Sequence, residues 1–269
     1  MAVVALHSAS TGLSSLSTQL DVIANNLANV NTTGFKAQRV NFEDLIYQQK
    51  SQPGVENLNG DMRPAGIEVG LGVRVSNTQS DFKTGAPLQT SADLDFFVEG
   101  DGFFQVDIAE DRGDGVGYTR AGNFFKNRDG ELVLGNSDGP RLVPPITIPD
   151  DAIDIEVSQD GSVQVLLPDQ VEFTEVGQLE LATFVNKAGL SHIGGNLFVE
   201  TEASGPPIVG EPGQQNFGSI LQGFLENSNV DPVEELVSLI RTQRAFELNS
   251  QSVQAADEAL QQISNLRRF

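Results

Sequence analysis

The chain has 269 residues, 39% of them hydrophobic, which is enough apolar material for one large domain or two modest ones and excludes a fully disordered protein. Its net charge of −21 is uneven, because residues 1–50 are neutral and residues 220–269 carry −3, leaving −18 for the middle. A surface this acidic repels phosphate backbones and predicts no nucleic-acid partner, and the lack of cysteine excludes disulfides and thiolate metal sites.

Apolar residues recur every seven positions in the N-terminal segment. One row contains Leu6, Leu13, Leu20 and Leu27, and a second row contains Ala9, Leu16, Ile23 and Val30. This spacing is typical of a coiled-coil helix. Gly34 can adopt the left-handed conformation that ends a helix, so we expect an N-terminal coiled-coil domain within residues 1–47.

The same N-terminal segment does not look like a targeting signal. Its first 30 residues lack a basic start, an apolar block and a small-residue cleavage site. No run in the chain approaches the roughly 18 consecutive apolar residues that cross a bilayer. If the protein leaves the cytoplasm, we expect a route that needs no cleaved signal peptide.

Short β-type runs separated by turn residues fill the middle of the chain. The runs cover residues 95–99, 103–106, 131–134, 146–148, 153–157, 163–167 and 178–185. They predict a central all-β domain over residues 76–204. Glycine and proline are frequent on both sides of it, which predicts an extended linker over residues 48–75 and a return linker over residues 205–224.

A second helix is expected within residues 225–269. Asp231 is a good N-cap residue and Pro232 suits the first helical position. One apolar row contains Leu239, Phe246, Val253 and Leu260, whereas the row beside it is mixed and contains Thr242, Asn249, Ala256 and Ile263. Such a face fits packing into a larger assembly, and an ordinary amphipathic helix on a globular core is an equal alternative. The predicted fold class is α+β, with the terminal helices paired as a coiled coil.

Residues for catalysis are not grouped in the sequence. The two histidines, His7 and His192, lie far apart, and no nucleophile elbow, phosphate-binding loop or metalloprotease motif occurs. The acidic loops at residues 111–114 and 127–129 lack the spacing of a calcium site and are interpreted as turns. We therefore expect no enzyme activity, no cofactor and no metal, with carboxylate-based hydrolysis as a remote alternative.

Several long segments resemble the flagellar basal-body rod and hook family. They include residues 21–36 (DVIANNLANVNTTGFK), 100–106 (GDGFFQV), 118–124 (YTRAGNF), 221–230 (LQGFLENSNV) and 243–247 (QRAFE). Residues 42–48 (FEDLIYQ) are similar to the distal-rod branch in particular. The resemblance extends over essentially the whole chain, although the first ten residues match poorly.

The resemblance implies a structural subunit that polymerises helically into the distal rod, a rigid hollow drive shaft that crosses the periplasm and carries torque from motor to hook. The implied partners are copies of the chain itself, proximal-rod and hook-side proteins, the surrounding rings, and the type III export apparatus of the flagellum.

Together with the repeats, the resemblance predicts a subunit interface. Its residues are Leu13, Leu16, Leu20, Ile23, Asn26, Leu27, Val30, Leu239, Phe246, Val253, Leu260 and Ile263. A proximal-rod or hook subunit, and a secreted binding protein or adhesin with a β domain, remain the alternatives.

Overall fold

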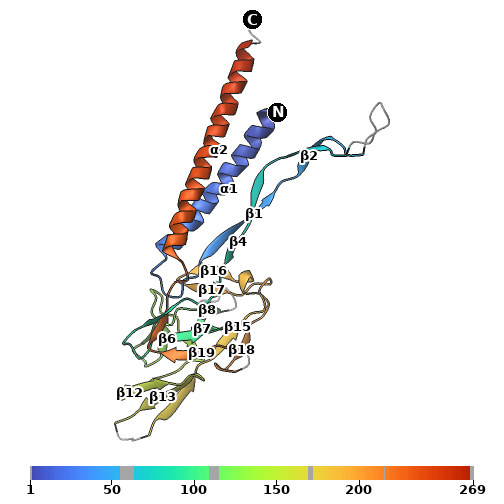
Figure 1. Cartoon of the computed structure of the whole chain (residues 1–269). Coiled ribbons are helices and arrows are strands. Elements are labelled where there is room, and N and C mark those ends of the chain that lie inside the picture. The colour runs from blue at the N-terminus through green and yellow to red at the C-terminus, as the bar shows by residue number, and fades with distance from the viewer. Residues whose placement is uncertain (1, 55–63, 109–114, 169–171, 215, 267–269) are drawn as a thin grey trace. The chain divides into compact units, whose positions relative to one another are not determined.

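The computed structural model describes residues 2–54, 64–108, 115–168, 172–214 and 216–266. The chain forms two compact units. The first, called here the helical unit, consists of Met1–Ala28, Gln38–Gln79 and Asp231–Phe269. The second, called the β unit, consists of Asn29–Ala37 and Ser80–Val230. The two terminal helices and the large β-rich middle region confirm the α+β class (Figure 1).

Helices α1 (Ala2–Ala28) and α2 (Pro232–Leu266) lie side by side in the helical unit (Figure 1). The start of α2 is as predicted, because Asp231 Oδ1 accepts hydrogen bonds from the N–H groups of Val233 (2.8 Å) and Glu234 (3.2 Å). The predicted helical range 1–47 is too long. Helix α1 stops at Ala28, and the left-handed turn at Gly34 (φ 70°) leads into strand β1 (Gln38–Asp44).

Strands β1 and β4 (Val73–Ser80) pair with each other, and β2 (Tyr47–Ser51) pairs antiparallel with β3 (Ile67–Gly70). These four strands are called the ribbon. The described part of range 48–75, predicted as an extended linker, is thus largely paired. The ribbon contacts α1, since the N–H of Val73 donates to Thr11 Oγ1 (3.4 Å) and His7 Nδ1 lies 2.9 Å from the carbonyl oxygen of Leu71.

The largest sheet of the β unit is antiparallel and has the order β16-β17-β8-β7-β15-β18, with β11 also paired to β7. Its strands are β7 (Phe103–Asp107), β8 (Val116–Thr119), β11 (Leu142–Val143), β15 (Leu181–Thr183), β16 (Ser191–Gly194), β17 (Leu197–Val199) and β18 (Ile208–Gly210). A short 3-10 helix, η2 (Lys187–Gly189), precedes β16.

Smaller antiparallel groups complete the β unit. They are β12 (Asp154–Val157), β13 (Ser162–Leu166) and β14 (Thr174–Gln178) in one sheet, β9 (Phe124–Lys126) with β10 (Leu132–Leu134), β6 (Phe96–Glu99) with β19 (Ser219–Gln222), and β5 (Pro87–Gln89) with β20 (Phe224–Glu226). Strands β18 and β19 fall in the range predicted as a return linker, and β20 ends before α2.

Most predicted runs coincide with strands, but two differ. The run 178–185 spans the end of β14 and all of β15. The run 146–148 is no named strand; an isolated bridge joins Thr147 to Glu131. Ile146 and Ile148 are nevertheless fully buried in the main core, where they pack with Phe96, Phe104, Val163 and other apolar side chains. These two side chains are therefore buried although the backbone of residues 146–148 forms no continuous strand ladder.

In the described part of the chain, no helix combines the length and apolar character that crossing a bilayer requires.

Candidate assembly surface and buried charge cluster

All of the predicted interface residues except Val30 lie on α1 or α2, which contact each other. Ile23 and Asn26 are buried, and most others are half-buried: Leu13, Leu16, Leu20, Leu27, Leu239, Phe246, Val253 and Leu260. Val30 is also half-buried but lies beyond the end of α1, and the side chain of Ile263 is outside the described residues. The side chains of the apolar rows are therefore only partly covered within one chain.

Helix α2 has a second apolar face, which the sequence reasoning missed. Val233, Leu236, Val237 and Ile240 are exposed, Val233 by 68% and Ile240 by 50%. Val233 and the buried Thr242 are nine positions apart, which at about 100° per residue puts them on opposite sides of the helix. We call these four residues the α2 outer stripe. Their i, i+3, i+4, i+7 spacing was visible in the sequence beside the seven-residue row.

The ribbon also exposes large apolar side chains. Ile46, in the link between β1 and β2, is 79% exposed, and Phe42, Tyr47 and Ile67 on the strands are exposed as well. Helix α1 contacts part of the ribbon but leaves these side chains uncovered, and two-stranded ribbons are marginally stable alone. The helical unit therefore presents apolar surface on both α2 and the ribbon.

Asn26 ties α1 to two other segments of the helical unit. Its side-chain oxygen accepts the N–H of Gln38 (2.9 Å), and its Nδ2 donates to the carbonyl oxygen of Gln38 (2.8 Å) and to Glu235 Oε1 (2.9 Å). The side chain is 1% exposed. A buried amide that satisfies backbone groups in both directions fixes the chain where β1 begins.

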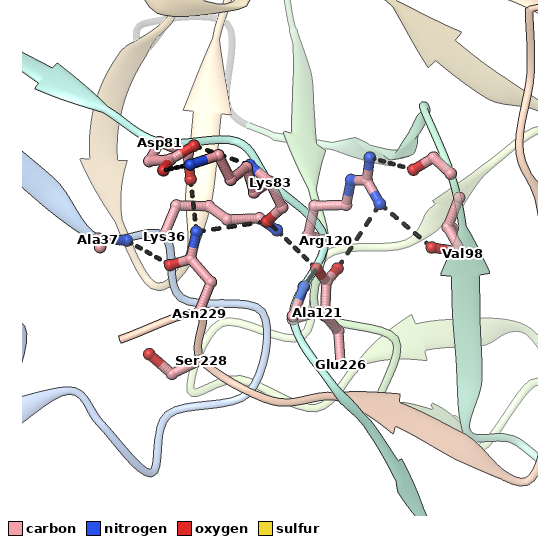
Figure 2. Close-up of polar contacts among 12 residues, drawn as sticks. Lys36, Ala37, Asp81, Lys83, Val98, Arg120, Ala121, Glu226, Ser228 and Asn229 are labelled. Atoms are coloured by element: carbon pink, nitrogen blue, oxygen red, sulfur yellow. Dashed lines mark hydrogen bonds and ion pairs between the residues drawn. The ribbon is translucent and has the colours of Figure 1, made fainter. Parts of the chain in front are cut away.

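Three charged side chains are buried together in the β unit, and we call them the charge cluster (Figure 2). Lys36 Nζ donates to Glu226 Oε1 (2.5 Å) and to the carbonyl oxygen of Lys83 (2.7 Å). Arg120 NH1 lies 3.6 Å from Glu226 Oε2, and its NH2 donates to the carbonyl oxygen of Gly100 (2.7 Å). The N–H of Gly85 also donates to Glu226 Oε1 (2.7 Å).

The cluster contains two cations and one anion, each about 1% exposed or less. Burial lowers the pKa of Lys36, and the charge of Arg120 adds to this effect while Glu226 opposes it. Burial likewise lowers the pKa of Arg120, whose guanidinium also stacks 5.2 Å from the Phe103 ring centre. Buried charges are costly unless paired, so Glu226 is the residue on which both cations depend.

Asn229 lies next to this cluster (Figure 2). Its Oδ1 accepts the N–H of Ala37 (2.7 Å), and its Nδ2 donates to the carbonyl oxygen of Asp81 (2.7 Å). The N–H of Asp81 in turn donates to the carbonyl oxygen of Ala37 (2.8 Å). Three distant parts of the chain are thereby joined in a closed ring of hydrogen bonds.

The histidines and acidic turns make local contacts. His192 Nε2 lies 2.8 Å from Ser80 Oγ, and burial lowers the pKa of His192. Asn127 Oδ1 accepts the N–H groups of Asp129 and Glu131 (both 2.9 Å) in the turn between β9 and β10, which confirms a hairpin there. The loop 111–114 lies outside the described residues. Among those residues, no group of three His, Asp or Glu side chains is arranged to hold a metal ion.

Three families match successive parts of the chain. Residues 6–36 match the family described as "Flagella basal body rod protein". Residues 97–165 match "Flagellar hook protein FlgE/F/G D1 domain", and residues 221–266 match "Flagellar basal body rod FlgEFG protein C-terminal". The matches cover most of α1, part of the β unit and α2.

Full-length relatives are similar over almost the whole chain. The "Flagellar basal-body rod protein FlgG" of Agrobacterium fabrum is 43% identical over 261 residues, which is 97% of this chain and 98% of the relative. Proteins of the same name from Caulobacter vibrioides (42% over 264 residues, 98% and 99%) and Buchnera aphidicola subsp. Baizongia pistaciae (43% over 262 residues, 97% and 99%) are equally similar. The chain therefore belongs to the flagellar basal-body rod family, as a structural subunit of the distal rod and not an enzyme.

Proposed function

We propose that this subunit polymerises helically with copies of itself, and that the terminal helices form a coiled-coil inner tube of a rigid, hollow shaft carrying torque from motor to hook. The observation that carries the proposal is the pair of apolar faces on α2. One face, centred on Thr242, is turned toward α1, and the opposite face exposes Val233 and Ile240. A helix with apolar residues on opposite sides needs a neighbour on each side.

A filament requires heterologous contacts, in which one surface of a copy meets a different surface of the next. The α2 outer stripe and the apolar residues of the ribbon supply two such surfaces on the described part of the helical unit. The half-buried rows, such as Leu20 and Phe246, would be completed by further copies.

In this proposal the twelve predicted interface residues act partly within the chain and partly between copies. For the polymer we keep the predicted ranges as a proposal: an inner helical domain from residues 1–47 and 225–269, connecting segments 48–75 and 205–224, and an outer β domain from residues 76–204. The connecting segments then include strands of the ribbon and strands β18 and β19. Proximal-rod proteins and hook-side proteins would bind the two ends of the polymer. The rings would surround it, and the flagellar type III apparatus would export its subunits.

Ile240→Asp tests the proposal, because the side chain is exposed and its replacement leaves the folded monomer intact. Gln243→Asp, an exposed polar position on the same helix, is the matched control. We expect Ile240→Asp to keep the circular dichroism and melting temperature of the purified wild-type chain. A strain producing it should have rods that stop short in electron micrographs of basal bodies, and it should not swim.

The control should assemble and swim. Normal rods in the Ile240→Asp strain, or an equal defect with Gln243→Asp, would contradict the assignment of the outer stripe to contacts between copies.

A further inference from the structure

The chain passes between its two units at several points, and three of them lie next to one side chain. The unit boundaries fall after Ala37, before Ser80 and after Val230. Ala37, Asp81 and Asn229 are thus the residues at or beside the points where these three segments leave the β unit. All three belong to the ring of hydrogen bonds closed by Asn229.

Each segment in this ring is bonded to both of the others. Asn229 uses its oxygen for Ala37 and its nitrogen for Asp81, while Asp81 donates its own N–H to the Ala37 carbonyl oxygen. The Asn229 nitrogen is also 3.3 Å from the carbonyl oxygen of Lys83. An asparagine is required for this, because the side chain must accept one backbone hydrogen bond and donate another.

The charge cluster binds the same three segments a second time, deeper in the β unit. Lys36 precedes Ala37, Glu226 lies on the segment that leads to Asn229, and the carbonyl oxygen of Lys83 follows Asp81. Lys36 Nζ contacts both of the other two segments with bonds of 2.5 and 2.7 Å. The segments are therefore joined by a half-buried amide and by a fully buried ion pair.

We propose that Asn229 is a positioning residue that makes the three connecting segments a single joint, so that a twisting load on one of them is shared by all three. This inference rests on the proposed role of the polymer as a drive shaft. Without the ring, only the charge cluster, deeper in the β unit, would join the three segments to one another. With it, a segment moves only when hydrogen bonds of the other two also break, because polar networks of this kind are cooperative.

Two variants of the full-length chain separate the parts of the ring. Asn229→Ala removes the bonds to Ala37, Asp81 and Lys83, whereas Asn229→Asp keeps the acceptor for Ala37 and places a carboxylate against the carbonyl oxygen of Asp81. Asn136→Ala is the matched control, since Asn136 accepts the N–H groups of Asp138 (3.1 Å) and Gly139 (2.8 Å) in a turn of the same unit.

Hydrogen exchange by mass spectrometry gives the first readout. In Asn229→Ala, the Ala37 amide loses its acceptor and should exchange roughly tenfold faster, the change expected when a hydrogen bond is lost. The Asp81 amide keeps its acceptor, the Ala37 carbonyl oxygen, and should exchange faster only because the ring is cooperative. Peptides from β7 should be unchanged, and Asn136→Ala should leave Ala37 and Asp81 protected. Asn229→Asp should accelerate exchange at Asp81 more than at Ala37. Unchanged exchange at both amides in Asn229→Ala would refute the proposal that Asn229 makes the three segments a single joint.

Swimming under load gives the second readout. Strains with either Asn229 variant should swim in dilute medium but lose speed more steeply than the Asn136→Ala strain as Ficoll raises the viscosity. Equal loss in all strains, together with faster exchange at Ala37, would refute load sharing and leave the proposed polymer standing. Failure of the wild-type chain to form rods would instead refute the proposed function, whatever the exchange result.

Discussion

Gly34 lies so close to the backbone of Ala121 that a Cβ on Gly34 would be 2.6 Å from the Ala121 nitrogen. Gly34 also has a φ of 70°, and its N–H donates to the carbonyl oxygen of Glu226 (2.8 Å). Within the β unit, the turn that contains Gly34 therefore packs directly against the backbone of Ala121. Glycine is required here both for the conformation and for the space.

Gly34→Ala is expected to lower the free energy of unfolding by more than about 3 kcal/mol, because backbone strain and a clash with backbone atoms add together. Gly139→Ala is the matched control, since Gly139 has a φ of 57° but a Cβ there meets no atom within 4 Å. The control should cost only about 1–2 kcal/mol. Urea unfolding of both variants measures the difference, and equal costs would contradict the close approach to Ala121.

Glu226→Gln should cost about 3–5 kcal/mol in unfolding free energy, since it leaves Lys36 and Arg120 buried without a counter-charge. Lys36→Met should cost less, about 1–3 kcal/mol, because Glu226 keeps Arg120 as a partner. Adding Lys36→Met to Glu226→Gln should cost less than the sum of the two, which a double-mutant cycle by urea unfolding detects. Strict additivity would mean that the two side chains do not interact.

The lowered pKa of Lys36 predicts a pH dependence. Between that lowered pKa and the ordinary value of 10.5, the unfolded chain binds more protons at this residue than the folded chain does. The contribution of Lys36 to stability therefore rises with pH through that window and is smallest below it. Relative to Lys36→Met, the wild-type chain should gain stability as the pH of urea unfolding is raised toward 10.5. A difference that is constant or falls with pH would contradict the buried, desolvated lysine.

Asn26→Ala should destabilise the helical unit by about 1–3 kcal/mol, because it leaves the N–H and carbonyl groups of Gln38 without their side-chain partner. Ser17→Ala, on the exposed side of α1, should change stability by less than about 0.5 kcal/mol. Circular dichroism at 222 nm during thermal unfolding follows the helices directly. A cost for Asn26→Ala no larger than that of the serine control would show that the bonds to Gln38 are dispensable.

Local chemistry in the sequence predicted much of the fold. The Asp231 cap begins α2 where expected, and the alternating runs at 103–106, 131–134 and 163–167 coincide with β7, β10 and β13. Such signals come from neighbours in the chain, so a sequence displays them. The ribbon was less visible, because Gln38–Asp44 pairs with Val73–Ser80 across a segment rich in glycine and proline.

The charge cluster could not be predicted. Lys36 and Glu226 are 190 positions apart, and charged residues are usually at the surface. The sequence therefore does not indicate that either side chain is buried. The outer stripe of α2 was overlooked for another reason. The seven-residue row ending at Leu260 accounts for the apolar face of a helix, and a few further apolar residues on the opposite face do not by themselves indicate a second one.

The β unit cannot be completed before its C-terminal strands, β19 and β20, are available. Strand β6 carries Phe96, which is fully buried, yet its partner β19 is made by Ser219–Gln222, and Glu226 follows on β20. In a chain that emerges with its N-terminus first, this part of the core can therefore close only after residues 219–226 have emerged. Only then can Lys36 pair with Glu226. The residues that precede β19 cannot close this part of the core alone, so the β unit is completed only after its C-terminal strands have emerged.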